Sequence, residues 1–163
     1  MMLGLSDIKD WLKKLDTKTV SEVCQMSVKE LNQTIVKELT NKSLIAEYIY
    51  IGKLDNKKEK SIGIYQLKRS NPPNIAIGGF SNTKIMEKSI SILVHWNKNA
   101  KETELKAYEI YYKLLCLRDF KINNRKVNFI KLLVPEPIDV GTDSSNVYER
   151  VIEATFYYEK EEL

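Results

Sequence analysis

The sequence predicts an α+β fold with a mostly antiparallel sheet and helices packed on one face. Helical periodicity dominates residues 1–43 and returns at 99–117, whereas alternating apolar and polar residues mark most of the remaining segments as strands. With 163 residues, 43% of them apolar, the chain can bury the core of one domain without a disulfide or metal. We therefore expect a single domain over 1–163, with a helical part at 1–43 and a sheet-and-helix core at 44–159.

Two helices are expected at the N-terminal end. Ser6 can cap a helix that runs to Leu15, because Ile8 and Leu12 repeat at helical spacing on one face. A Ser-x-x-Glu capping box then precedes a second helix, expected over 28–39.

The next segments predict a β-hairpin followed by a long loop. Residues 44–54 and 61–67 are rich in Ile and Tyr, and the polar tract between them is typical of a turn. Residues 70–84 contain two prolines and two glycines, so they fit neither a helix nor a strand. We interpret Gly78 and Gly79 as turn residues, since the spacing of a phosphate-binding loop is missing.

The C-terminal half predicts a strand, a helix, a hairpin and a final strand. Alternation over 88–96 indicates a strand, and Asn99 begins a capping-box pattern for a helix that runs to about Leu117. Two asparagines at 123–124 can supply the positive φ angles of a tight turn between two further strands. Alternation resumes at Tyr148 and continues to 158.

Candidate catalytic and metal-binding residues are few, and the sequence predicts no enzyme, cofactor or metal site. His95 is the only histidine, and we expect a hydrogen-bonded structural role for it. Cys24 and Cys116 lack the spacing of a zinc site and are expected to be reduced thiols. Asp139 and Asp143 could share a cation, but turn capping explains them better, because calcium prefers six to eight oxygen ligands.

Charge and hydropathy limit the remaining function classes. The net charge is +4, from 26 basic and 22 acidic residues, and no basic run forms a nucleic-acid arm. Nine tyrosines raise a stacking hypothesis, but several of them fall at core spacings. No apolar run reaches the roughly 20 residues that span a bilayer, and the N-terminal residues do not form a signal peptide. We therefore expect a protein made in the cytoplasm, with no membrane partner.

Residues 135–146 are expected to form a stiff loop that serves as an interface. Pro135, Pro137 and Gly141 restrict its shape, and a restricted loop loses less entropy when it docks on a partner. The turn at Gly78 is the second candidate contact. The candidate interface residues are Pro135, Pro137, Asp139, Gly141, Asp143, Asn146, Gly78 and Gly79.

Several segments, in one order along residues 48–159, carry a family resemblance. They include the segment 50–65, the Ile-Gly-Gly turn at 77–79, Ser-Ile-Leu-Val-His-Trp-Asn at 91–97, the Glu-Thr-Glu helix start at 102–104, Val-Pro-Glu-Pro-Ile-Asp-Val-Gly-Thr-Asp at 134–143 and Val-Tyr-Glu-Arg-Val-Ile at 147–152. Together they resemble the clostridial phage proteins known as minor capsid proteins, which are similar to the tail terminators of long-tailed bacteriophages. Residues 1–45 match least.

The resemblance implies a structural virion protein of the phage tail. Such a subunit closes into a homohexameric ring on the tail tube, ends tube polymerisation and forms the head-tail joint. Its partners are then its own copies, the tail tube protein, the head-tail connector and, where one is present, the sheath protein. DNA passes through the ring without sequence-specific binding. Two alternatives stay open: a small nucleic-acid-binding module, which needs its lysines on one face, and a small enzyme, which needs a pocket with His95 beside a carboxylate.

Overall fold

A computed structural model describes residues 2–15, 46–68 and 72–161 of the chain. The helix expected over 28–39 and Cys24 lie outside these ranges. The elements are α1 (Leu5–Lys14), β1 (Tyr48–Ile51), β2 (Ser61–Gln66), the short 3-10 helix η3 (Phe80–Asn82), β3 (Ile85–His95), α4 (Ala100–Cys116), β4 (Arg118–Ile122), β5 (Arg125–Leu132), β6 (Ile138–Thr142) and β7 (Tyr148–Glu159).

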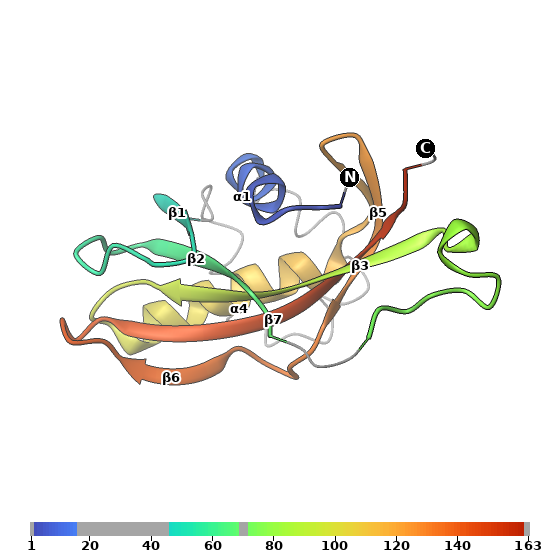
Figure 1. Cartoon of the computed structure of the whole chain (residues 1–163). Helices are drawn as coiled ribbons and strands as arrows, with labels where there is room; N and C mark the ends of the chain where they lie inside the picture. The colour runs from blue at the N-terminus through green and yellow to red at the C-terminus, as the bar shows by residue number, and fades with distance from the viewer. Residues whose placement is uncertain (1, 16–45, 69–71, 162–163) are drawn as a thin grey trace.

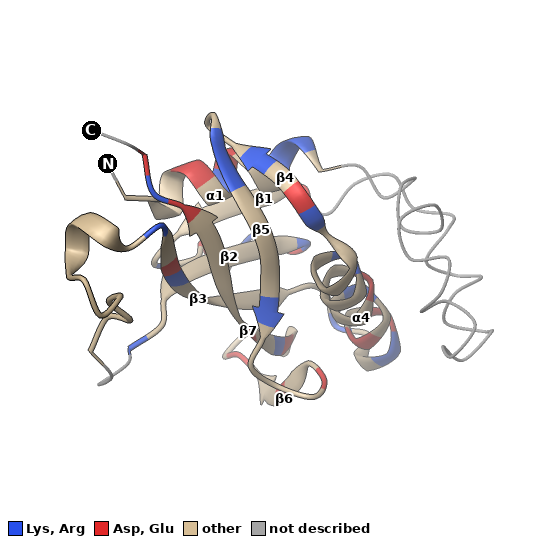
Figure 2. Cartoon of the chain, turned by 90° about the vertical axis from the view of Figure 1, so that its right-hand side faces the viewer, with Lys and Arg blue, Asp and Glu red and all other residues tan. Residues whose placement is uncertain are grey.

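A curled, mostly antiparallel seven-stranded sheet organises the fold, as Figures 1 and 2 show. Its strand order is β1-β2-β3-β7-β5-β4, and β6 pairs with β7 outside this path. The β3–β7 ladder is continuous from the Ile85–Glu159 pair to the His95–Glu149 pair. On its other edge β7 pairs with β5 toward its C-terminal end and with β6 toward its N-terminal end. The predicted antiparallel sheet is therefore confirmed, with β7 as its central strand.

The first two strands are parallel, so the predicted β-hairpin is wrong. Tyr48 is paired with Ser61 and Ile51 with Ile64, both in the same direction. After Ile51 the chain turns at Gly52, whose φ is +72°, and residues 52–60 return to the starting end of β1. Leu54 is buried within this connection and packs beside Gly63, where an added Cβ would lie 3.1 Å from Leu54 Cγ. A buried residue in a polar tract thus marks a crossover connection rather than a tight turn.

Local capping agrees with the sequence at α4 and differs at α1. The Asn99 side chain accepts hydrogen bonds from the amides of Lys101 (3.0 Å) and Glu102 (3.3 Å), which confirms the predicted start of this helix. At α1 the N-cap is Gly4 rather than Ser6, because the Asp7 carboxylate accepts the Gly4 amide at 2.9 Å.

Two further predictions concern a turn and a thiol. Asn123 and Asn124 have φ angles of +46° and +64° and join β4 to β5, as predicted. Cys116, the last residue of α4, is disulfide-bonded, so the expected reduced thiol is wrong for this residue.

Neither α-helix of the described residues has the length and apolar character that crossing a membrane requires.

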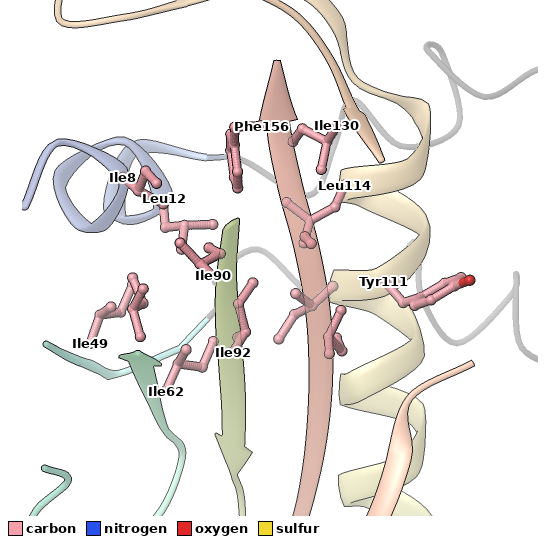
Figure 3. Close-up of a cluster of buried hydrophobic side chains, with 14 of the residues drawn as sticks. Ile8, Leu12, Ile49, Ile62, Ile90, Ile92, Tyr111, Leu114, Ile130 and Phe156 are labelled. Atoms are coloured by element: carbon pink, nitrogen blue, oxygen red, sulfur yellow. The ribbon is translucent and has the colours of Figure 1, made fainter. Parts of the chain in front are cut away.

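The core lies between the curled sheet and the two α-helices (Figure 3). Alternate residues are buried from Ile90 onward in β3 and from Ile152 onward in β7, as their alternation predicts. Trp11 of α1 stacks on Phe120 with a centroid distance of 4.9 Å and meets Phe156 edge-on at 5.9 Å. Because α1 contacts β1, β2 and β4, it joins strands from both ends of the sheet order. The main buried side chains are Ile8, Leu12, Ile62, Ile64, Ile90, Ile92, Val94, Ala107, Ile110, Leu114, Ile152, Ala154 and Phe156.

Candidate interaction surfaces

The two segments expected to form interfaces lie at opposite ends of the β3–β7 ladder (Figure 1). We call residues 72–84 the arm; it leads into β3 where Ile85 is paired with Glu159. We call residues 138–147 the hairpin segment; it comprises β6 and the turn into β7, beside the His95–Glu149 pair. At about 3.4 Å per residue, the 11 residues of β3 separate these ends by roughly 34 Å.

Side-chain hydrogen bonds give the arm a defined shape. Thr83 Oγ1 donates to the Gly79 carbonyl (3.1 Å) and accepts the Ala76 amide (3.0 Å). Asn82 Nδ2 donates to the Gly78 carbonyl at 2.8 Å, and a Cβ on Gly78 would lie 2.1 Å from that nitrogen. Gly79 has a φ of +86°. Both glycines are therefore turn residues, as predicted.

The arm presents large apolar side chains to solvent. Ile75 and Phe80 are each about half exposed, and Ile77 at the turn is fully exposed. Lys160 fixes the base of the arm, because its ammonium donates to the Phe80 carbonyl (2.7 Å) and lies 3.9 Å from the Phe80 ring centroid. A hollow lined by 80–85 and 159–161 lies beside this contact. Exposed apolar groups on an ordered segment are typical of a protein-binding surface.

The hairpin segment contains a strand where the sequence predicted an irregular loop. Ile138 is paired with Val151 and Thr142 with Tyr148, and Gly141, with a φ of +89°, marks a β-bulge. All five residues of β6 are exposed. In the described ranges β6 pairs with β7 alone, so its outer edge presents backbone groups as well as Ile138 and Val140 side chains.

Aspartates shape the hairpin segment, as the turn-capping interpretation predicted. Asp143 Oδ1 accepts the amides of Ser145 and Val147, both at 2.9 Å. Asp139 Oδ1 accepts the Gly141 amide at the same distance. The carboxylates therefore bond local backbone amides, which restricts the segment before any partner binds.

Two tyrosines of α4 form hydrogen bonds to the corner that leads into β6, and a third packs against their rings. The Tyr111 hydroxyl lies 2.8 Å from the carbonyl oxygens of Val134 and Pro135 and donates to them. The Tyr108 hydroxyl donates to Glu136 Oε2 at 2.9 Å. Tyr112 stacks on Tyr108 with a centroid distance of 5.9 Å. Pro137, which follows this corner, is buried, so it is a packing residue rather than an exposed contact.

This tyrosine contact predicts a loss of stability at alkaline pH. Burial and the hydrogen bond to Glu136 raise the pKa of Tyr108 from 10.0 to about 12, and burial also raises the pKa of Tyr111. A raised folded-state pKa means that the stabilisation is complete below pH 10 and is lost as the pH rises through about 12. We expect the melting temperature to fall over this interval, and to fall less steeply in Tyr108→Phe. The measurement is a series of thermal melts at increasing pH. If the melting temperature falls equally steeply in the unaltered chain and in Tyr108→Phe, Tyr108 is not the group responsible.

His95 lies under the hairpin segment between two carboxylates. Its Nδ1 is 2.8 Å from Glu149 Oε1, its Nε2 is 3.9 Å from Asp143 Oδ2, and its side chain is 0% exposed. The predicted hydrogen bond of His95 is confirmed, whereas its structural role stays a prediction; the structure adds the two acidic neighbours that the sequence did not reveal. The enzyme alternative would be favoured by a pocket in which His95 lies beside a carboxylate. The carboxylates of Asp143 and Glu149 are beside it, the imidazole is fully buried, and the hollow beside the arm lies at the opposite end of β3.

Acidic residues accompany most of the positive charge of the described structure; β5 carries Arg125, Lys126 and Lys131 without an acidic residue of its own, but acidic groups of other segments pair with the first two. Figure 2 shows that β4 and α4 carry acidic residues among their Lys and Arg residues. Lys126 illustrates the mixing, since it forms ion pairs with Glu159 (3.1 Å) and Asp119 (3.6 Å). The convergence of lysines that the nucleic-acid alternative requires is not seen on these elements.

Comparison with known proteins gives one family. A family model described as bacteriophage tail terminator protein matches residues 22–160, which is most of the chain. No curated protein matches the sequence.

Proposed function

The chain belongs to the bacteriophage tail terminator family, and from this premise we propose that its subunits form a six-membered ring that caps the tail tube, ends tube polymerisation and forms the head-tail joint. Members of this family are structural proteins of the virion tail. The number six comes from the family resemblance, and the positions of the arm and the hairpin segment support closure of a ring.

The observation that supports this proposal is that the two shaped, exposed segments lie at opposite ends of one continuous ladder. A closed ring requires a heterologous interface, in which one surface of a subunit meets a different surface of its neighbour. The arm offers exposed side chains such as Ile77, whereas β6, which among the described residues pairs with β7 alone, offers its outer edge and Val140. Docking an apolar segment along a strand edge is a recurrent mode of protein recognition.

The candidate interface residues take different parts in this proposal. Gly78 and Gly79 shape the arm, while Asp139, Gly141, Asp143 and Asn146 shape the hairpin segment. Pro135 lies at the corner held by Tyr111, and buried Pro137 sets the entry of the chain into β6. Most of these residues therefore act by fixing the shape of the contact, and the exposed Ile and Val side chains provide its apolar area.

The proposal extends to the partners and to the arrangement of the subunit. One face of the ring meets the tail tube protein, with the sheath protein where one exists, and the other meets the connector. DNA passes through without sequence-specific contacts, consistent with a net charge of only +4. The protein acts in the virion tail after synthesis in the host cytoplasm. We further propose one tail-terminator-like domain with its helices on one face of the sheet, supported by the core cluster that α1 and α4, the α-helices of the described ranges, share.

Imaging of tail ends tests this function. Purified tails incubated with the protein are expected to carry a terminal ring with six-fold symmetry, and added protein should stop tube growth in a polymerisation assay. Native mass spectrometry of the released rings should give six copies. Five-fold rings, open helical assemblies, or tubes that continue to grow in the presence of the protein would overturn the proposal.

A further inference from the structure

The cluster of His95, Asp143 and Glu149 contains two buried polar atoms that no hydrogen bond satisfies. One potential ligand atom from each residue lies within 4.8 Å of the others. Within the described residues, His95 Nε2 and Asp143 Oδ2 are buried without a hydrogen-bond partner, and they are 3.9 Å apart. That separation is too long for a direct hydrogen bond. A buried polar atom that stays unpaired costs free energy, so a group that bonds to both atoms would stabilise the fold.

We propose that His95 Nε2 and Asp143 Oδ2 bind a divalent transition-metal ion of the Zn²⁺ class. In tetrahedral coordination, zinc bonds of about 2.0–2.2 Å to nitrogen and oxygen place two ligand atoms roughly 3.3–3.6 Å apart. The separation of 3.9 Å is slightly longer, so ion binding has to draw the two atoms together. An imidazole ligand favours zinc and similar metals over calcium and magnesium, which prefer all-oxygen sites.

Glu149 is the residue that orients the imidazole. Its Oε1 lies 2.8 Å from His95 Nδ1, and accepting the Nδ1 proton leaves the Nε2 lone pair directed at Asp143. Metal-binding histidines regularly donate their second ring nitrogen to a carboxylate in this way. The Asp143 side chain is 8% exposed at the turn but its Oδ2 is buried, so the ion and the water molecules that complete its coordination would enter only when the turn opens.

The bound ion would connect the hairpin segment to β3. Asp143 already uses Oδ1 to accept the amides of Ser145 and Val147, so its two oxygens have separate roles. Metal binding at Oδ2 would thus fix the turn to the sheet without disturbing the turn itself. This inference does not depend on ring formation, because all three residues belong to one subunit.

Zn²⁺ titration of the full chain tests the site with matched variants. Asp143→Asn keeps the oxygen that caps the turn and replaces Oδ2 by an amide, whereas Asp139→Asn makes the same change at a turn with no histidine nearby. We expect Zn²⁺ to raise the melting temperature of the unaltered chain and of Asp139→Asn, but not of Asp143→Asn. Glu149→Gln should bind roughly 10–100-fold more weakly. Co²⁺ in place of Zn²⁺ should produce visible absorption bands that Asp143→Asn lacks.

Two outcomes would overturn the proposal. Absence of Zn²⁺ binding by the unaltered chain in calorimetry would show that a proton or a water molecule alone satisfies the pair. Equal Zn²⁺ affinity in the unaltered chain and in a folded Asp143→Asn variant would place the metal elsewhere. If six-fold rings persist in the presence of a chelator, the proposed ring function does not depend on the metal. The metal site and the ring function can therefore be contradicted independently of each other.

Discussion

Subunits with a damaged arm and subunits with a damaged hairpin segment are expected to form heterodimers when mixed, although neither forms a ring alone. The changes are Ile77→Asp in the arm and Val140→Asp in β6, both at exposed positions. A carboxylate buried without a partner should weaken each contact by about 2 kcal/mol or more, which is about 30-fold. In the mixture, the arm of the Val140→Asp subunit and the hairpin segment of the Ile77→Asp subunit are both intact, so these two subunits can form one interface. The remaining arm and hairpin segment are both altered, so no further subunit can join and the ring cannot close.

Native mass spectrometry under conditions in which the unaltered chain forms rings distinguishes the alternatives. Lys121→Asp on β4 is the control, since it introduces the same residue at an exposed position of another strand. The free energy of unfolding of all three variants should lie within about 0.5 kcal/mol of the value for the unaltered chain. Homodimers of the arm variant would indicate a self-complementary interface through the hairpin segments. Rings of either variant would remove the altered segment from the interface.

Phe156→Ala is expected to reduce the free energy of unfolding by about 3–5 kcal/mol. Phe156 is 0% exposed in the middle of the sheet, and its ring meets Trp11 of α1. The truncation therefore creates a cavity and also removes a contact that holds α1 against β7. Denaturant unfolding gives the value directly.

Glu153→Ala is the matched control for this measurement. Glu153 lies on the same strand but is not in the core cluster, so its truncation should change stability by no more than about 0.5 kcal/mol. A cost below about 1 kcal/mol for Phe156→Ala would contradict the packing of α1 on the sheet.

Local patterns predicted most elements of the fold because the relevant physics acts over a few residues. Alternation along 88–96 and from Tyr148 identified the two longest strands, since each has one buried face. Asn99 marked the start of α4 through hydrogen bonds to amides two and three residues away. The direction of β1 was not predictable in this way, because it depends on the packing of Leu54 beside Gly63 across a connection.

The candidate interaction surfaces were likewise predicted only where local sequence patterns are sufficient. The sequence identified residues 135–146 as a restricted segment from its Pro, Gly and Asp content, but the alternation over 138–142 is too short and too exposed to indicate β6. His95 and Glu149 are 54 residues apart, and only the β3–β7 register makes them neighbours. The family resemblance reached the correct family, which local patterns alone did not reveal.

The continuous β3–β7 ladder has a consequence for the dimensions of an assembly. If the arm and the hairpin segment are the two contact surfaces, the number of paired residues between Ile85 and His95 determines how far apart neighbouring contacts lie around the circumference. Inserting two residues in each strand would preserve the buried and exposed faces, because side chains alternate with a period of two. The same insertion would lengthen each segment of the circumference by roughly 7 Å. Relatives that fit tubes of different diameter could therefore differ in ladder length while they keep the same core pattern.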